Sequence, residues 1–257
     1  LGGAGGDDIK ANEGEGPAVF DASNIIVGDH GEITFFNPLI GTNFPMLVQS
    51  RDFKNGGKDK IHSGAGNDLL IGGTDIDLIF GMGGEDLIAG DHLLVEGVNG
   101  GLIDLSTLTL SEPTDDNIQA TSIATGAEDG GADDVIYGGA GDDLIMGQQG
   151  ADTIFGGQGD DDIIGGHNVA GGADAGDAID GGAGDDVILG DNGTIYRTEE
   201  NGTVLTVDNR MRALEGTTIY GTNLHAELGD VNDGLLLVTG DAQANVDGTT
   251  QRAIIIF

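Results

Sequence analysis

Residues 138–164 repeat a nine-residue pattern three times in succession, and this repeat restricts the fold more than any other feature of the chain. The units begin at Gly138, Gly147 and Gly156, and each reads G-[GQ]-x-G-x-D-x-I-x. Aspartate is sixth and isoleucine eighth in all three units. The pattern predicts a turn of six residues followed by a strand of three, repeated without interruption.

The physical properties of the unit predict how the copies stack. Glycine at positions 1, 2 and 4 allows backbone conformations with positive φ and close packing of carbonyl groups. In the strand, the aliphatic residue at position 8 points to one face and its neighbours point to the other. Two units would complete a flattened coil with a turn at each edge, and stacked coils would pair as parallel strands about 4.8 Å apart. The fold class is therefore all-β, a parallel β-roll (a β-helix-like solenoid) with a thin aliphatic core.

The aspartates at position 6 would form one row along each edge of such a roll. Two carboxylates about 4.8 Å apart repel each other by roughly 1 kcal/mol in water and several-fold more at an effective dielectric constant of ~20. A cation between them would remove this repulsion. Carboxylate and carbonyl oxygens are the ligands that a hard cation such as Ca²⁺ prefers.

The units resemble the glycine- and aspartate-rich nonapeptides of RTX (repeats-in-toxin) proteins, which bind Ca²⁺ in a parallel β-roll. Degenerate copies elsewhere in the chain keep the sixth aspartate and the eighth aliphatic residue. The resemblance implies several bound calcium ions, each between two turns on the same edge that lie two units apart in the sequence. The implied metal ligands are Asp59 with Asp77, Asp68 with Asp86, Asp134 with Asp152 and Asp143 with Asp161, together with Asp177 and Asp186, whose partners the resemblance leaves open.

The composition fits a thin solenoid better than a broad globular core. The 257 residues include 50 glycines and no cysteine or tryptophan, and their net charge is −36. From Ile61 to Tyr196 there are 27 Asp and Glu residues and no Lys or Arg, so repulsion from phosphates excludes nucleic acid as a partner. Without a cation such a segment would be disordered, and we therefore expect calcium binding and folding to be coupled.

The repeats fall into two blocks separated by strand-rich insertions, in which Asn99-Gly100-Gly101 and Asn201-Gly202 are predicted hairpin turns. Residues 1–53 contain the end of a preceding repeat, including Asp7, and a strand-rich insertion. The blocks and insertions that follow are 54–92 (first β-roll block), 93–128 (insertion), 129–193 (second β-roll block) and 194–257 (strand-rich insertion that leads to a next module).

A second motif, G-D-[HN], recurs at Gly28-Asp29-His30, Gly90-Asp91-His92 and Gly190-Asp191-Asn192. It is interpreted as the point where a block closes, and its aspartate is either a turn residue or a terminal calcium ligand. Histidine is replaced by asparagine in the third copy, which favours a turn role over a chemical role for the imidazole. The acids at position 5 are expected to be solvated: Glu85, Asp133, Asp142, Asp160 and Asp185.

No catalytic motif is present, and we expect no enzymatic activity and no catalytic residue. No apolar run approaches the ~18 residues that cross a membrane. Leu1 begins within a repeat and Phe257 ends within an aliphatic strand, so we expect the chain to be part of a longer array.

The expected function is an extracellular or cell-surface calcium-binding module that acts as a stalk, fibre or adhesin spacer and contacts neighbouring copies or modules. Calcium sites built from turns belong to the weak extracellular class, with Kd values of about 10⁻⁴–10⁻³ M. The alternative is the calcium-binding secretion domain of an exported protease or lipase. The family resemblance makes type I secretion compatible with both.

Overall fold

A computed structural model describes residues 1–11, 22–35, 45–97, 101–105, 118–123, 130–184, 186–199, 219–220, 236–237 and 250–256. The chain divides into two compact parts. One comprises Leu1–Ser111, Asp115–Ile195 and Ile255–Phe257, and the other comprises Glu112–Thr114 and Tyr196–Ile254. All the elements of the described residues are β-strands.

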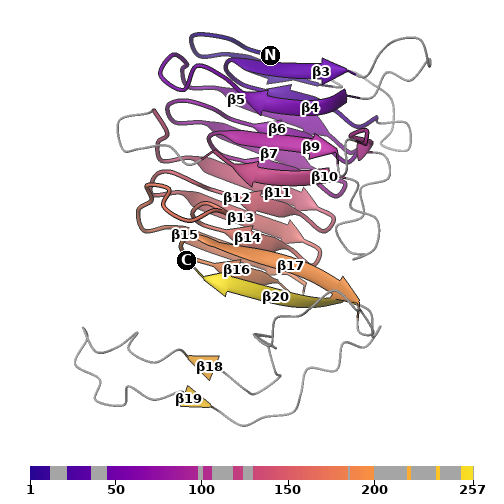
Figure 1. Cartoon of the computed structure of the whole chain (residues 1–257), viewed down its shortest axis with the longest axis vertical. Helices are drawn as coiled ribbons and strands as arrows, with labels where there is room; N and C mark the ends of the chain where they lie inside the picture. The colour runs from indigo at the N-terminus through magenta and orange to yellow at the C-terminus, as the bar shows by residue number, and fades with distance from the viewer. Residues whose placement is uncertain are drawn as a thin grey trace. The chain divides into compact units, whose positions relative to one another are not determined.

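Two parallel six-stranded sheets form the roll in the first part (Figure 1). The chain alternates between them, so that each nonapeptide contributes a strand to one sheet and the next contributes a strand to the other. Sheet A has the order β1 (Asp8–Lys10), β5 (Lys60–Gly64), β7 (Leu78–Met82), β11 (Val135–Ala140), β13 (Thr153–Gln158) and β15 (Ala178–Ala183). Sheet B has the order β2 (Ile25–Val27), β6 (Leu69–Ile71), β8 (Leu87–Ala89), β12 (Leu144–Met146), β14 (Asp162–Ile164) and β16 (Val187–Leu189).

The predicted β-roll is confirmed, and the roll is continuous where the sequence was interpreted as two separate blocks. β7 pairs directly with β11, with Ile79 opposite Ile136. β8 likewise pairs with β12, with Ile88 opposite Ile145. Residues 54–92 and 129–193 therefore form one stack of coils, from which the intervening residues leave and to which the chain returns.

The position-8 residues form the core between the two sheets, as predicted. Burial of each aliphatic side chain stabilises the roll by about 1.5–3 kcal/mol, and the flat coil leaves room for only one such residue per strand. The core cluster consists of Ile26, Ile61, Leu70, Ile79, Ile88, Ile136, Ile145, Ile154 and Ile163, with Ile9, Ala11 and Ile179 packed against it.

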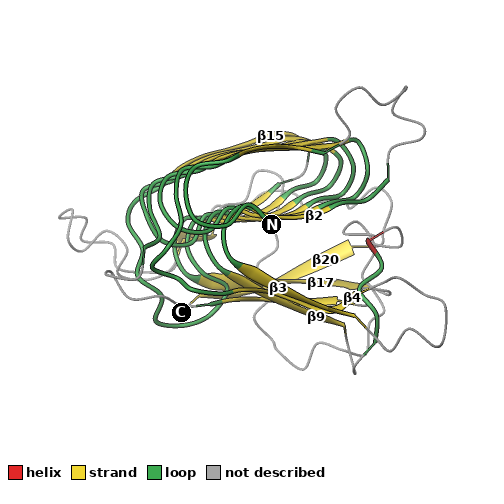
Figure 2. Cartoon of the chain, turned by 90° about the horizontal axis from the view of Figure 1, so that it is seen from above, coloured by secondary structure: helices red, strands yellow, loops and turns green. Residues whose placement is uncertain are grey.

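A third sheet covers the outer face of sheet B. Sheet C is antiparallel, with the order β10 (Ile118–Ser122), β9 (Leu93–Gly97), β4 (Pro45–Ser50) and β3 (Gly31–Phe35). Figure 2 shows β3, β4 and β9 on the side of sheet B that faces away from sheet A. The Ser122 hydroxyl lies 3.6 Å from the sulfur of Met146, an outward-facing residue of sheet B. The excursions from the roll therefore bury the outer face of sheet B beneath their own strands.

The outer face of sheet A carries a column of stacked rings at position 9. Neighbouring ring centroids are 4.5 Å apart for His62 and Phe80, 5.0 Å for Phe80 and Tyr137, and 4.9 Å for Tyr137 and Phe155. Such aromatic pairs contribute about 0.5–1.5 kcal/mol each beyond their area burial. Each inner ring has both faces covered by its neighbours, so the column stabilises the stacking of coils.

The remaining strands belong to two small sheets. β17 (Gly193–Glu199) pairs with β20 (Thr250–Ile256), and β18 (Ile219–Tyr220) pairs with β19 (Leu236–Leu237). The predicted turns at Asn99-Gly100 and Asn201-Gly202 lie outside the described residues. Among the residues that the structure describes, there is no helix of the length and apolarity required to cross a membrane.

Candidate metal centre

The position-6 aspartates form a ladder of hydrogen bonds along each edge of the roll. We call the edge where the chain passes from sheet B to sheet A the first edge, and the opposite edge the second edge. On the first edge the Asp59 N–H donates to Oδ1 of Asp77 over 2.8 Å, and the Asp77 N–H donates to Oδ1 of Asp134 over 2.8 Å. The whole first-edge ladder is Asp7, Asp59, Asp77, Asp134, Asp152 and Asp177.

The second edge repeats this arrangement with one substitution. The Asp68 N–H donates to Oδ1 of Asp86 over 2.8 Å, and the Asp86 N–H donates to Oδ1 of Asp143 over 2.9 Å. Asn24 occupies the first place, and its N–H donates to Oδ1 of Asp68 over 2.6 Å. The second-edge ladder is Asn24, Asp68, Asp86, Asp143, Asp161 and Asp186.

The ladders bring together all ten predicted ligands, including pairs that sequence reasoning did not assign. Partners are 18 residues apart in a regular coil, but Asp77 and Asp134 are 57 residues apart and Asp152 and Asp177 are 25 apart. These larger separations span excursions from the roll and cannot be read from a nine-residue period. Asp7, which has no neighbouring repeat in the sequence, bonds to Asp59.

In the units that begin with glycine, the second oxygen of the ladder carboxylate points to a cradle beside that glycine; the unit of Asp68 begins with Ser63 instead. A Cβ built on Gly72 would overlap Oδ2 of Asp77 and the carbonyl oxygen of Gly90 in the next coil. A Cβ on Gly81 would meet Oδ2 of Asp86 and the carbonyl of Gly138 in the same way. The glycine therefore leaves open the point on which a carboxylate oxygen and a carbonyl oxygen converge.

Several of these carboxylate oxygens are buried and make no hydrogen bond within the part of the chain that the structure describes. A buried acceptor without a partner loses about 1–3 kcal/mol of stabilisation, and more when it is charged. A cation in the cradle would supply the missing partner. Such Oδ2 atoms include those of Asp59, Asp77, Asp86, Asp134, Asp152 and Asp177.

Burial and mutual repulsion raise the pKa values of several ladder carboxyls. Desolvation is the larger cause for Asp86, followed by the charges of Asp143 and Asp68, and together they raise its pKa to about 9. Desolvation also raises the pKa of Asp77 to about 9, opposed by a backbone hydrogen bond and assisted by the neighbouring carboxylates. The carboxylates are therefore unfavourable as isolated charges at neutral pH, and a divalent cation would reverse this preference.

The cradles suit a cation that accepts backbone ligands. In the described residues no three His, Cys, Asp or Glu side chains are placed to hold one metal ion. A cation in a cradle would thus combine carboxylates with glycine carbonyls. Such oxygen ligands fit Ca²⁺, which accepts six to eight oxygens in flexible geometry, better than zinc, which prefers nitrogen and sulfur.

The acids at position 5 lie outside the cradles. Asp133 is exposed and Asp142 is half-buried, and each accepts a backbone N–H from the next coil, from Ala151 and Asp160 respectively, over 2.8 Å. Asp185 lies outside the described residues. These acids stabilise the stacking of turns at the surface.

Comparison with known proteins identifies the repeats. The family model described as the RTX calcium-binding nonapeptide repeat matches four copies, over residues 55–70, 62–91 and 128–163. The matched residues include eight of the ten predicted ligands, all except Asp177 and Asp186. No curated protein and no solved structure matches the chain. The chain therefore carries RTX calcium-binding nonapeptide repeats, folded as a parallel β-roll.

Proposed function

We propose that this chain is a calcium-dependent structural module of a larger secreted or cell-surface protein, where it serves as a stalk, fibre or adhesin spacer. In this role the roll is a scaffold without enzymatic activity. Its calcium ions occupy the cradles along both edges, with the ten position-6 aspartates as ligands: Asp59, Asp68, Asp77, Asp86, Asp134, Asp143, Asp152, Asp161, Asp177 and Asp186.

The continuity of both ladders through the excursions is the observation that carries this proposal. The first-edge ladder runs from Asp7 to Asp177 although the chain leaves the roll after Gly28, Gly90 and Gly165. A scaffold that presents excursions while keeping one core fits a spacer or adhesin module. A secretion tail has no need for repeated insertions.

Calcium would control folding of the module. The chain carries a net charge of −36, and the ladder carboxylates are stacked within hydrogen-bonding distance of the neighbouring backbone. Without cations this charge disfavours the compact state. With cations, the free energy of binding contributes to folding, so the two processes are coupled. Weak sites of this kind fill at extracellular rather than cytosolic calcium concentrations, which supports an extracellular location.

Calcium titration of chelator-treated protein tests the folding part of the proposal. We expect a cooperative rise of the β-sheet circular dichroism signal with Ca²⁺ and a much smaller response to the same concentration of Mg²⁺, which demands a tighter octahedral site. A spectrum that is indifferent to chelator would contradict calcium-dependent folding.

Electron microscopy of the calcium-loaded parent protein tests the structural role. Elongated particles or filaments are expected for a stalk or fibre. Compact particles in which the roll is joined to a catalytic domain would instead favour the alternative, a secretion domain of an exported enzyme.

A further inference from the structure

Three turns on the first edge are cut by excursions, and each is closed by residues far apart in the sequence. Gly28 faces Oδ2 of Asp59, just as Gly72 faces Oδ2 of Asp77 in an uncut turn. Gly90 faces Oδ2 of Asp134 in the same way, and Gly165 faces Oδ2 of Asp177. The interpretation of G-D-[HN] as the end of a block is therefore wrong for its first two copies, where the glycine is position 1 of a turn that continues after the excursion.

The aspartate of the motif joins the two ends of the cut turn to the next coil. Asp91 accepts the Ala132 N–H at Oδ1 over 3.2 Å and the Gln149 N–H at Oδ2 over 2.7 Å. Ala132 lies in the returning segment, and Gln149 is in the uncut turn of the next coil. The carboxylate thus fills the space that the glycine-rich backbone fills in an uncut turn, and a Cβ on Gly131 would overlap it.

Asp29 makes the equivalent pair of bonds in the first cut turn. Its Oδ1 accepts the Gly57 N–H over 3.1 Å, and its Oδ2 accepts the Thr74 N–H. Gly57 and Thr74 hold the same repeat positions as Ala132 and Gln149, the fourth and the third. Asp29 and Asp91 are 2% and 0% exposed, so the geometry recurs with full burial.

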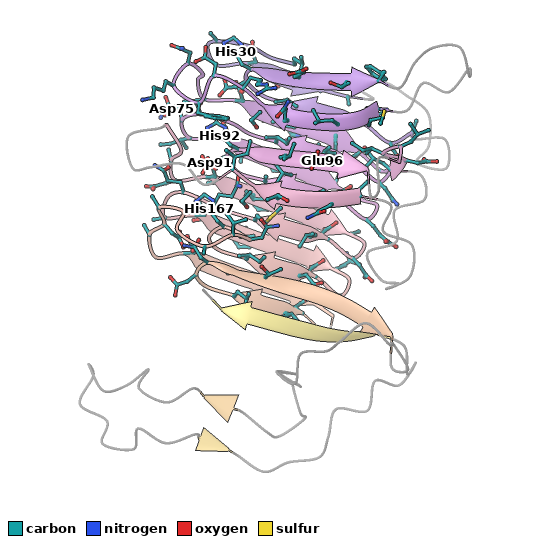
Figure 3. All side chains as sticks on the ribbon, viewed as in Figure 1. His30, Asp75, Asp91, His92, Glu96 and His167 are labelled. Atoms are coloured by element: carbon teal, nitrogen blue, oxygen red, sulfur yellow. The ribbon has the colours of Figure 1, made fainter. Side chains whose placement is uncertain are left out.

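The coil that follows the cut adds a second contact through an amide side chain. Gln148 accepts the Asp91 N–H at Oε1 over 3.0 Å and donates from Nε2 to the His92 carbonyl over 2.7 Å. Asn192 makes the corresponding pair of bonds in the third cut turn, between Gly165 and Asp177. It accepts the His167 N–H over 2.6 Å and donates to the Gly172 carbonyl over 3.1 Å. Figure 3 shows Asp91, His92 and His167 on the same edge of the roll.

We propose that Asp29 and Asp91 are positioning residues that close the cut turns, and that they are not calcium ligands. This inference rests on the proposed calcium-dependent function. Both oxygens of each carboxylate already accept a backbone N–H, whereas Oδ2 of Asp59 and Oδ2 of Asp134 have no hydrogen-bond partner among the described residues. By fixing the returning segment, the motif aspartate places the position-6 aspartate in its cradle, whatever the length of the excursion.

Counting bound calcium in the full chain separates a positioning residue from a ligand. Equilibrium dialysis would give the number of ions and the half-saturating calcium concentration for wild type, Asp91→Asn and Asp134→Asn. Asp142→Asn is the matched control, because it removes the same charge from a residue outside the cradles, while Oδ1 of asparagine can still accept the Asp160 N–H. We expect Asp91→Asn to keep the wild-type number of ions and to raise half-saturation roughly tenfold, as for one lost charge-assisted hydrogen bond. Asp134→Asn should bind at least one ion fewer, and Asp142→Asn should match wild type.

Loss of an ion in Asp91→Asn, equal to the loss in Asp134→Asn, would overturn the inference and leave the calcium-dependent function standing. Wild-type protein that binds no calcium would instead overturn the proposed function itself. If Asp91→Asn does not fold, hydrogen exchange in calcium-loaded Asp29→Asn provides the second test. Faster exchange of the Gly57 and Thr74 amides with an unchanged ion count supports positioning, and unchanged exchange at both amides contradicts it.

Discussion

The two edges of the roll perform the same task with different chain connectivity. From Ser63 to Asp186 the second edge is built from uncut turns, whereas the first edge alternates uncut turns with turns that are opened by excursions. Both edges nevertheless carry the same aspartate ladder and the same cradles. A cradle therefore depends on the two ends of its turn, the first glycine and the sixth aspartate, and not on continuous chain between them.

The excursions leave on the first edge because of what they must cover. The chain leaves after β2 and β8, which are strands of sheet B, and the next strands, β3 and β9, enter sheet C over the outer face of sheet B. Departure from the second edge would follow a strand of sheet A instead. The ring column on sheet A, in which Tyr137 is 37% exposed, lies on a face that no strand of the described residues covers.

The largest expected effect is a reversal of the pH dependence of folding when calcium is removed. The pKa of Asp77 on the first edge and that of Asp86 on the second are each raised to about 9. The metal-free native state therefore binds more protons than the unfolded state between about pH 4 and about pH 9. Its stability is highest at the acid end of this range and falls as pH rises through it, by several kcal/mol in total.

Calcium-loaded protein should show the opposite trend, because the ligands must be deprotonated to bind. Circular dichroism of calcium-stripped protein should therefore gain β-signal as pH falls from 8 to 4, whereas the loaded protein should lose it. The same direction of change in both states would contradict the account of the ladders. Carrying out the experiment with Asp77→Asn and with Asp86→Asn would show whether the two edges contribute equally.

Alanine at the first glycine of a turn tests whether a cut turn and an uncut turn hold equally rigid cradles. A Cβ at Gly90 on the first edge or at Gly138 on the second would overlap a carboxylate oxygen and a carbonyl oxygen. We expect Gly90→Ala and Gly138→Ala each to cost about 1–3 kcal/mol in calcium-loaded protein, as overpacking does. Urea unfolding in calcium measures the change.

Gly190→Ala is the control for this pair, since a Cβ there would have no neighbour within 4 Å among the residues that the structure describes. It should leave the unfolding midpoint close to that of wild type. A much smaller cost at Gly90 than at Gly138 would mean that the cut turn relaxes around the new methyl group, and that the edges are not equivalent.

The smallest expected effect concerns two acids at position 5, the exposed Asp133 and the half-buried Asp142. Asp133 lies in the first-edge turn before β11, and Asp142 lies in the second-edge turn before β12. Each accepts one backbone N–H over 2.8 Å. We expect Asp133→Ala and Asp142→Ala each to cost about 0.5–1.5 kcal/mol, the net contribution of one hydrogen bond. Thermal melts in calcium would measure this, with exposed Asp180→Ala on sheet A as the control for loss of charge. A cost no larger than that of Asp180→Ala would mean that these bonds do not stabilise the turns.

The nine-residue period predicts the roll, the core and the two rows of aspartates because each follows from a single repeat position. Ile154 is in the core and Asp152 in a ladder for reasons contained within one unit. The pairing of Asp77 with Asp134 was not predictable in this way, because its separation is set by an excursion and not by the repeat. The sequence alone indicates that Gly90 ends a block, whereas the structure shows that it is position 1 of a cut turn.

The sequence also indicates which sheet is covered, because the residue type at position 9 alternates with a period of two units. Position 9 in successive sheet B strands is aliphatic, as at Ile71, Met146 and Ile164, whereas in sheet A it carries rings, as at Phe80 and Phe155. A nine-residue comparison averages these two classes together. An eighteen-residue comparison separates the face that an antiparallel sheet covers from the face that a ring column lines.

A crystal structure of the calcium-loaded chain, with anomalous scattering to locate the ions, would show whether both edges bind calcium. We predict ions along both edges, bound by Oδ2 of the ladder aspartates and by carbonyls of the position-1 glycines. The decisive location is the cradle beside Gly72, where Oδ2 of Asp77 and the carbonyl of Gly90 converge. Gly90 begins the turn that the longest excursion interrupts. Ions on the second edge alone, or cradles filled by water on both edges, would contradict the claim that cut and uncut turns form one calcium-binding scaffold.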